Sequence, residues 1–369
     1  MAKEEIKRAD ILSSLQEMVM GLDGVRKGEN GRRPVEVTLS EVIDGKFGIS
    51  RDAFNEILGI NPYVTTMENI YSMPDQSVRW VVPEIIREAI TLGMRQAPFY
   101  PNIISSDQSI NGLQATMPFI NMSDATPAKI NEAETIPLGD ISYGQKSVSL
   151  FKIGKGFKMT DEVKNYVSLD VLGIYIRDFG VQLGYALDTL AMDVLMNGNK
   201  PDGSESAPVI GVYNTANGIT YKDLLHIWVR AARLGRNFTT MIGGEDQAIE
   251  LLDLPEFKER HSGTTEATLN IKSPVPNKAD FYIHPGTPDN QLLLVDTSAA
   301  LIKLTARQLM LESERIVSNQ TEAVYATLTT GFSKMYQDAV LLLAADQEFT
   351  SNGFPSFMTI DPYLTVGLE

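Results

Sequence analysis

The chain has 369 residues, which is enough for two or more lobes with cores of their own. It contains no cysteine, and this excludes disulfides, thiolate nucleophiles and cysteine-held metals. Its formal charge of −15 disfavours bulk binding to nucleic acid, because a polyanion gains nothing from counterion release. We find no apolar signal segment at its start and no run that could span a bilayer, so we expect a folded protein made in a cytoplasm.

Residues 1–75 are expected to form an N-terminal extension or a small domain. Apolar positions in Ala2–Met20 follow a helical period. Residues 34–42 alternate apolar and polar side chains, which predicts a short strand. Ser50 then stands where a capping residue would begin a helix over residues 50–58.

Residues 76–105 are expected to form an N-terminal arm that contains a helix. The helix should open near Trp80 and carry Pro83 close to its first turn. Proline does no harm there, because the N–H that it lacks would have no partner in the helix.

Two strands joined by a polar tip follow the arm. Gly112–Ile120 and Tyr143–Met159 predict a long β-hairpin, with residues 131–140 at its tip. The alternation changes phase near Leu150, which predicts a bulge or a strong twist there. An isolated two-stranded hairpin is only marginally stable in water, so this one should lie against another surface. A neighbouring copy of the chain is the expected support.

A single long helix is predicted over Asp170–Asn197. At roughly 1.5 Å per residue, it would form a rod on the order of 40 Å long. Its apolar stripe recurs at steps of three and four residues and includes Leu172, Phe179, Leu183 and Leu190. Three glycines off this stripe leave two interpretations open, close packing of another element or tolerated surface positions. They are Gly173, Gly180 and Gly184.

The remaining chain mixes short elements of both kinds. Short helices and strands alternate between residues 221 and 288, and a sheet-rich stretch runs from Leu309 to Leu343. The tail from Gln347 has no strong period. This mixture predicts an α+β fold.

Residues capable of chemistry do not converge on a site. The three histidines, His226, His261 and His284, lie in different predicted elements without zinc-ligand spacing. Glu132 and Glu134 are paired carboxylates of the kind that glycosidases use, but their hairpin tip lacks aromatic walls, so a surface loop is preferred. His226 lies on a largely apolar helix, where a half-buried structural histidine is preferred. We therefore predict no catalytic, cofactor-binding or metal-binding residue, and leave open a carboxylate-only magnesium or calcium site.

The hairpin-to-helix block resembles the major capsid proteins of tailed double-stranded DNA phages, which have the Hong Kong 97-type fold. The likeness covers roughly Trp80 to Ala345 and rests on element order and loose patterns. The segments that carry it are Trp80-Val-Val-Pro83-Glu, Asn131-Glu-Ala-Glu134-Thr-Ile-Pro-Leu, Lys158-Met-Thr-Asp-Glu162-Val and Pro208-Val-Ile-Gly211.

The resemblance implies a phage major capsid fold with four parts after the N-terminal arm. Residues 106–160 would form an extended β-hairpin loop that reaches over a neighbour. Residues 161–205 and 295–345 would form a peripheral domain with a long spine helix. Residues 206–294 would form an axial domain that faces the capsomer centre, and residues 346–369 a C-terminal tail.

The resemblance also implies where copies of the chain touch. In the extended loop, the residues expected at the inter-subunit contact are Lys129, Glu132, Glu134, Lys146, Phe151 and Phe157. The residues expected to pack the spine helix are Leu172, Phe179, Leu183 and Leu190. Some relatives join a loop lysine to an asparagine of another subunit, but we identify no matching asparagine and expect no cross-link.

The implied partners are copies of the chain itself, arranged as pentamers and hexamers in an icosahedral shell. The shell would enclose double-stranded DNA without sequence-specific binding, with no cofactor and no membrane partner. Portal, scaffold and decoration proteins are further candidate partners. The expected location is the virion, after assembly in the host bacterial cytoplasm. Some relatives lose a scaffolding segment to a protease, whereas residues 1–75 are expected here to be retained.

Two rival functions remain. An encapsulin-like compartment shares the fold but encloses enzyme cargo, and neighbouring terminase, portal and tail genes would separate it from a phage capsid. A soluble acidic α+β enzyme that uses carboxylates belongs to a different class. A stable monomer with a deep pocket would support that second rival.

Overall fold

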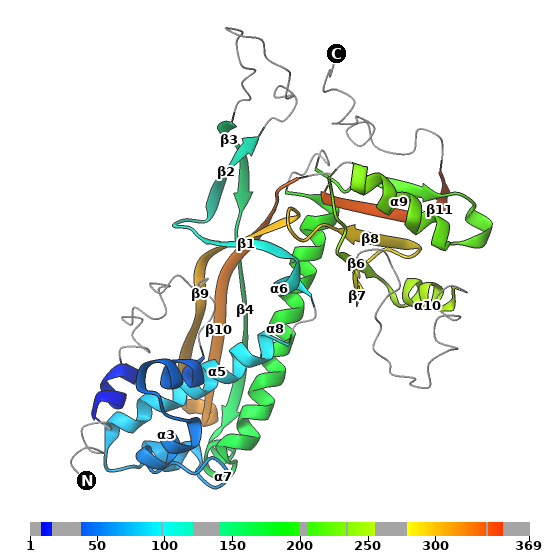
Figure 1. The fold of residues 1–369 in the computed structure, drawn as a ribbon. Helices are drawn as coiled ribbons and strands as arrows, with labels where there is room; N and C mark the ends of the chain where they lie inside the picture. Colours follow the sequence, from blue (N-terminus) through cyan, green and yellow to red (C-terminus); the bar gives the residue numbers. More distant parts are fainter. Residues whose placement is uncertain are drawn as a thin grey trace. The chain divides into compact units, whose positions relative to one another are not determined.

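Figure 1 shows a computed structural model of the chain. It describes residues 9–16, 38–96, 99–120, 141–199, 205–233, 235–254, 279–336 and 339–349. The chain divides into two compact units, each assembled from three stretches. Unit 1 consists of Met1–Pro98, Phe151–Asp188 and Thr305–Thr330, and unit 2 consists of Phe99–Leu150, Thr189–Leu304 and Gly331–Glu369. Both units combine helices and strands, which confirms the predicted α+β class.

Unit 1 begins with short helices and one longer helix. They are a helix over residues 9–16, α2 (Leu39–Val42), the π-helical turn η2 (Ile43–Phe47), α3 (Arg51–Leu58), α4 (Met67–Tyr71), the 3-10 helix η3 (Gln76–Trp80) and α5 (Val81–Met94). We call residues 38–80 the N-terminal block. Ser50 caps α3 as predicted, because its side chain accepts a hydrogen bond from the N–H of Ala53. Phe54, Met67 and Ile70 are buried in the block, which gives it a core.

The strand predicted over residues 34–42 is wrong for its described part, which is helical. The reason is a capping box. The N–H of Glu41 donates to the Thr38 hydroxyl, and the N–H of Thr38 donates to the Glu41 carboxylate at 2.9 Å. Two backbone donors are thereby paired at a helix start, a local signal that outweighs the short apolar alternation.

Unit 1 also contains strands and most of the long helix, whose residues from Thr189 onward belong to unit 2. β4 (Phe151–Thr160) pairs antiparallel with β10 (Thr321–Lys334), from Phe151 opposite Thr330 to Thr160 opposite Thr321. β9 (Leu301–Ile316) lies on the other side of β10 and joins it through η7 (Val317–Asn319). After β4 come α7 (Asp161–Tyr166) and α8 (Leu169–Asn197). The long helix predicted over Asp170–Asn197 is therefore confirmed.

α5 crosses α8 at a close approach between two glycines. A Cβ added at Gly180 would lie 2.3 Å from the carbonyl oxygen of Ile90, and one added at Gly93 would lie 2.1 Å from that of Arg177. A Cβ at Gly173 would meet nothing within 4 Å. Close packing is thus the correct interpretation for Gly180, and an open position is correct for Gly173.

Unit 2 is built on a five-stranded sheet with the order β5-β11-β8-β6-β7. Its strands are β5 (Val209–Val212), β6 (Thr240–Gly243), β7 (Asp280–Ile283), β8 (Gln291–Val295) and β11 (Val340–Glu348). Two helices pack against it, α9 (Tyr221–Arg233) and α10 (Glu245–Asp253). Leu224 and Trp228 of α9 and Leu251 of α10 share a core with Leu292 and Leu343 of the sheet. The predicted alternation of short helices and strands is confirmed here.

Unit 2 also holds the described part of the hairpin. α6 (Tyr100–Ile103) and β1 (Ile104–Ser109) precede β2 (Gln114–Ile120), which pairs antiparallel with β3 (Ile141–Ser149). The continuous strand predicted over Tyr143–Met159 is wrong, because the chain breaks at Leu150 into β3, which pairs with β2, and β4, which pairs with β10. The predicted irregularity near Leu150 marks this change of partner.

Candidate assembly surface

The hairpin of β2 and β3 forms a two-stranded sheet of its own. Its register shifts between Met117 and Pro118, and Lys146 stands opposite Met117. Proline lacks the N–H that a further ladder bond would need, so the shift at Pro118 has a local cause. The predicted contact residues Lys129, Glu132 and Glu134 lie outside the described residues. In the described residues, the hairpin therefore consists of two strands that pair with each other and with no third strand. Such a hairpin is only marginally stable by itself.

The other two predicted contact residues lie on β4 and differ in exposure. Phe151 is 54% exposed. Phe157 is half-buried, and its ring centroid lies 5.3 Å from that of Phe179 on α8, in an edge-to-face arrangement. The Lys155 side chain bonds to Gln182 and passes over the Phe179 ring. Phe157 therefore packs within its own chain, whereas Phe151 presents most of its ring to the outside.

The long helix α8 has apolar side chains on two faces. Leu172, Phe179 and Leu183 are buried against the chain, and Leu190 is half-buried. A second set of apolar side chains is exposed and includes Val171, Ile174, Tyr175 and Tyr185. A globular surface helix usually has one apolar stripe, so the second set indicates a further contact.

The largest exposures lie on segments that hydrogen bonds join at the starts of α7 and α8. Tyr63, Val64, Tyr166, Tyr175 and Val317 are 70–83% exposed, more than any other large hydrophobic side chain in the described ranges. All five belong to unit 1. We call them the tip patch.

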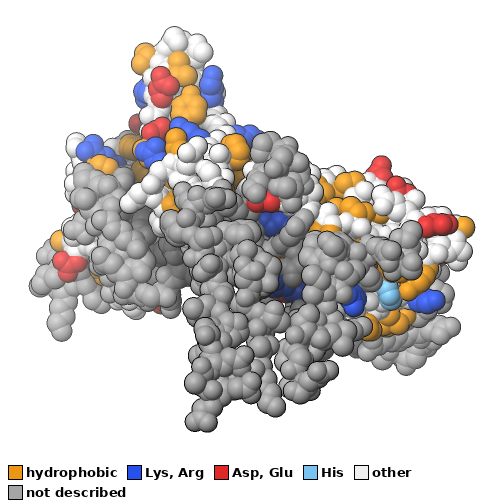
Figure 2. Space-filling model, turned by 90° about the horizontal axis from the view of Figure 1, so that it is seen from above, with side chains coloured by type: hydrophobic (Ala, Val, Ile, Leu, Met, Phe, Trp, Pro, Cys, Tyr) orange, Lys and Arg blue, Asp and Glu red, His pale blue; other side chains and the backbone are white. Residues whose placement is uncertain are grey.

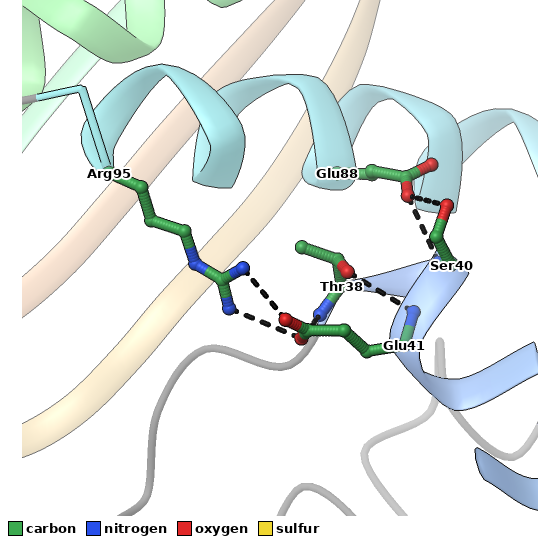
Figure 3. A network of polar contacts seen from close by, with 5 residues as sticks. All are labelled: Thr38, Ser40, Glu41, Glu88 and Arg95. Carbon is green, nitrogen blue, oxygen red and sulfur yellow. Dashed lines mark hydrogen bonds and ion pairs between the residues drawn. The ribbon is translucent and has the colours of Figure 1, made fainter. Parts of the chain in front are cut away.

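A polar network holds the N-terminal block to α5 (Figure 3). The Arg95 guanidinium donates to both carboxylate oxygens of Glu41, at 2.9 and 3.2 Å. The bond from Arg95 lowers the pKa of Glu41, with further bonds from Thr38. Glu88 of α5 accepts from the N–H of Ser40 at 3.0 Å and pairs with Arg51 at 3.1 Å. Charged side chains from separate segments thus fix the block in place.

A second joint ties the N-terminal block to the sheet of unit 1. Lys164 of α7 pairs with Glu322 of β10 at 2.7 Å, and their side chains are only 6% and 17% exposed. The Lys164 ammonium also lies 5.6 Å from the ring centre of Tyr71 in α4. Burial, with help from Glu322, raises the pKa of Tyr71 to about 12. Three elements that are distant in sequence therefore meet at one buried charge.

The described residues show packed histidines and no metal cluster. His226 is half-buried, and its ring centroid lies 4.9 Å from that of Phe349, while His284 is buried with its ring 5.2 Å from Phe99. Burial lowers the pKa of both histidines. His261 lies outside the described ranges. Within those ranges, no three His, Cys, Asp or Glu side chains could hold a metal ion, and no helix is long and apolar enough to cross a membrane.

A family model described as phage capsid protein matches residues 144–346, which is more than half of the chain. The chain belongs to the phage capsid protein family. The match runs from β3 to β11 and so contains β4, α8 and the five-stranded sheet. It confirms the predicted family and the predicted role, so the protein is a structural, shell-forming capsid protein of a bacteriophage.

Several solved structures are similar to this capsid protein. A virus-like particle from Pyrococcus furiosus has a TM-score of 0.49 and 12% identity, over 70% of this chain and 97% of that chain. Gordonia phage Cozz has a TM-score of 0.47 and 15% identity, over 66% and 85%. The holo-SrpI encapsulin complex from Synechococcus elongatus PCC 7942 has a TM-score of 0.46 and 10% identity, over 82% and 99%. No curated protein matches the capsid protein at a significant level.

Proposed function

We propose that this capsid protein assembles through pentamers and hexamers into an icosahedral shell that encloses double-stranded DNA. The observation that carries the proposal is the family match from β3 to β11. Repeated head-to-tail contacts between identical subunits close into rings when the rotation between subunits closes. Such rings are the units from which a closed shell can be tiled.

The hairpin is the first proposed contact between subunits. β2 and β3 pair with each other, and a two-stranded sheet gains stability when it is pressed against another surface. We place the hairpin over a neighbouring subunit, with Lys129, Glu132, Glu134 and Lys146 at the contact. Phe151 joins them, because more than half of its side chain is exposed at the point where β3 gives way to β4.

The proposed domains follow the predicted boundaries with two refinements. The predicted boundaries are residues 161–205 and 295–345 for the peripheral domain and residues 206–294 for the axial domain. β11 extends to Glu348 and pairs with β5 and β8, so we assign it to the axial sheet. β4 pairs with β10 along ten residues of register, so we assign it to the peripheral sheet instead of the loop.

The proposed shell encloses DNA without sequence-specific binding. The chain carries a formal charge of −15, which disfavours tight binding to phosphates. On the face drawn in Figure 2, basic, acidic and hydrophobic side chains are interspersed over the described surface. Portal, scaffold and decoration proteins are proposed as further partners of the shell.

Electron microscopy of the purified protein over a range of concentrations tests this function. We expect closed particles above a threshold concentration, and nuclease-resistant DNA in particles purified from infected cells. Particles that enclose a protein cargo and no DNA would favour an encapsulin-like compartment instead. A protein that stays monomeric at every concentration, with and without co-expressed phage proteins, would overturn the proposal.

A further inference from the structure

We propose that the tip patch is a docking surface for a second copy of this chain. The N-terminal block supplies two of the five residues of the patch, so the block is retained in the assembled shell. The inference rests on the proposed self-assembly and names one surface that performs it. Tyr63 and Val64 come from the loop between α3 and α4, Tyr166 from α7, Tyr175 from α8 and Val317 from η7.

The exposed apolar area of the tip patch indicates that it binds a partner. Three tyrosines and two valines that are each at least 70% exposed present on the order of 500 Å² of apolar side-chain surface. Exposed apolar surface of this extent is often functional on a soluble protein. Tyrosine is enriched at such sites, because its ring buries a large area while its hydroxyl tolerates water.

The backbone beneath the patch is held by hydrogen bonds between its segments. The N–H of Leu169 donates to the carbonyl of Thr65, and the N–H of Asp170 donates to that of Pro62, both at 3.1 Å. Thr66 and Ser168 form an isolated antiparallel bridge. These bonds satisfy donors at the start of α8 and fix the block's loop beside it. A surface that is ordered before binding loses less entropy on docking.

A further hydrogen bond joins the turn that carries Val317 to the start of α7. The N–H of Asp161, at the start of α7, donates to the carbonyl of Gln320 at 3.1 Å. The Arg315 side chain pairs with the Asp161 carboxylate, also at 3.1 Å. The turn between β9 and β10 is therefore tied to the start of α7, and α7 lies near the start of α8 at the lower end of unit 1 in Figure 1.

The chemistry of the patch fits a copy of the chain better than it fits nucleic acid. Its rim carries both signs of charge, with Asp170 exposed and Arg315 paired to Asp161. Acidic groups there would repel phosphates, whereas mixed charges around an apolar centre are typical of protein interfaces. A shell protein works surrounded by copies of itself, so the partner present at the required stoichiometry is a second copy.

The N-terminal block is consequently part of the assembled subunit. Removing residues 1–75 would take away Tyr63 and Val64 together with the carbonyl partners of Leu169 and Asp170. Intact-mass measurement of subunits from assembled shells should therefore show that any cleavage lies before Thr38. Shells whose subunits begin after Tyr63 would overturn this part of the inference.

The patch itself is tested by the double variant Tyr63→Ser/Tyr166→Ser, with Tyr63→Phe/Tyr166→Phe as its matched control. Val229→Ser is a second control, because Val229 lies on α9 of unit 2 and is 63% exposed. Light scattering and electron microscopy measure the protein concentration at half-assembly. Circular dichroism and the thermal midpoint establish that each variant is folded.

We expect the serine variant to raise the concentration at half-assembly about tenfold or more, with an unchanged thermal midpoint, because two exposed anchors of the contact are lost. The phenylalanine variant and Val229→Ser should assemble within about twofold of the wild type. Normal assembly of the serine variant, or equal losses in Val229→Ser, would overturn the docking surface. If the wild type itself forms no particles, the proposed function fails and not the patch alone.

Discussion

Unit 1 and unit 2 hold themselves together in different ways. Unit 2 gathers its apolar side chains around one sheet, where Leu292, Leu293 and Leu294 of β8 are completely buried. Unit 1 is joined by specific contacts between distant segments, such as the buried Lys164–Glu322 pair and the crossing of Gly93 and Gly180. It also carries the most exposed large hydrophobic side chains. The unit that relies on buried charge pairs and close helix contacts in addition to its core is thus also the unit with the most exposed large hydrophobic side chains.

The two tryptophans allow each unit to be followed separately. Trp80 lies in unit 1 and Trp228 in unit 2. In a Trp228→Phe background, fluorescence reports unit 1, and in a Trp80→Phe background it reports unit 2. Unfolding by urea under conditions that do not allow assembly then shows which unit a substitution weakens.

The largest effect is expected from Glu322→Ala. It leaves the Lys164 ammonium, whose side chain is only 6% exposed, without its counter-charge. Removing one partner of a buried ion pair costs about 3–5 kcal/mol, because an uncompensated charge remains buried. The free energy of unfolding measured from Trp80 should fall by that amount, while the Trp228 signal should change much less.

The double variant Lys164→Met/Glu322→Leu is the control for this prediction. It removes both charges and keeps apolar volume, so its stability should lie within about 1 kcal/mol of the wild type. A double variant as unstable as Glu322→Ala would show that the loss comes from packing and not from the buried charge.

Smaller changes in the free energy of unfolding, opposite in sign, are expected from substitutions at Gly180 and Gly173 of α8. Gly180→Ala should destabilise unit 1 by about 1–3 kcal/mol, because the added methyl group meets the Ile90 carbonyl oxygen and forces α5 and α8 apart. Gly173→Ala, on the same helix, should stabilise it by up to about 1 kcal/mol, since alanine has the higher helix propensity and its methyl group meets nothing. Urea unfolding followed at Trp80 measures both, and equal signs would contradict the close crossing.

The smallest expected effect is the pH-dependent contribution of Glu41 to the stability of the protein. The pKa of Glu41 is lowered from its ordinary value of 4.5 by the bond from Arg95, so its contribution is present above that value and is lost as the pH falls through the folded pKa. Glu41→Gln should lower the thermal midpoint slightly at pH 7, by the equivalent of about 0.5 kcal/mol, as expected for a partly exposed pair. The difference from the wild type should disappear in acid, and a difference that grows on acidification would contradict this assignment.

Local patterns predicted the elements that depend on neighbours in sequence. The period of three and four residues in α8 predicted its bounds within one residue, and Ser50 predicted the start of α3. The Thr38–Glu41 capping box is also a local signal, and attention to it would have replaced the strand over residues 34–42 with a helix start. The family resemblance came from the order of these elements and is confirmed by the match over residues 144–346.

Exposed residues of the tip patch could not have been predicted from sequence alone. Tyr63, Tyr166 and Val317 are separated by long stretches of chain, and each looks like an ordinary apolar position in its own segment. Only the hydrogen bonds around the start of α8 bring their segments together. The predicted loop residues Lys129, Glu132 and Glu134 remain predictions, because they lie outside the described residues.

Patterns of neighbouring residues predicted the long helix, the first strand of the hairpin and the α+β mixture, and the order of these elements carried the resemblance to the capsid family. Tertiary structure alone decided that the return strand changes partners at Leu150 and that Gly180 is a contact while Gly173 is not. The physical reason is that strand pairing and helix crossing depend on distant segments. A glycine or an alternating strand has the same local appearance whichever partner it meets.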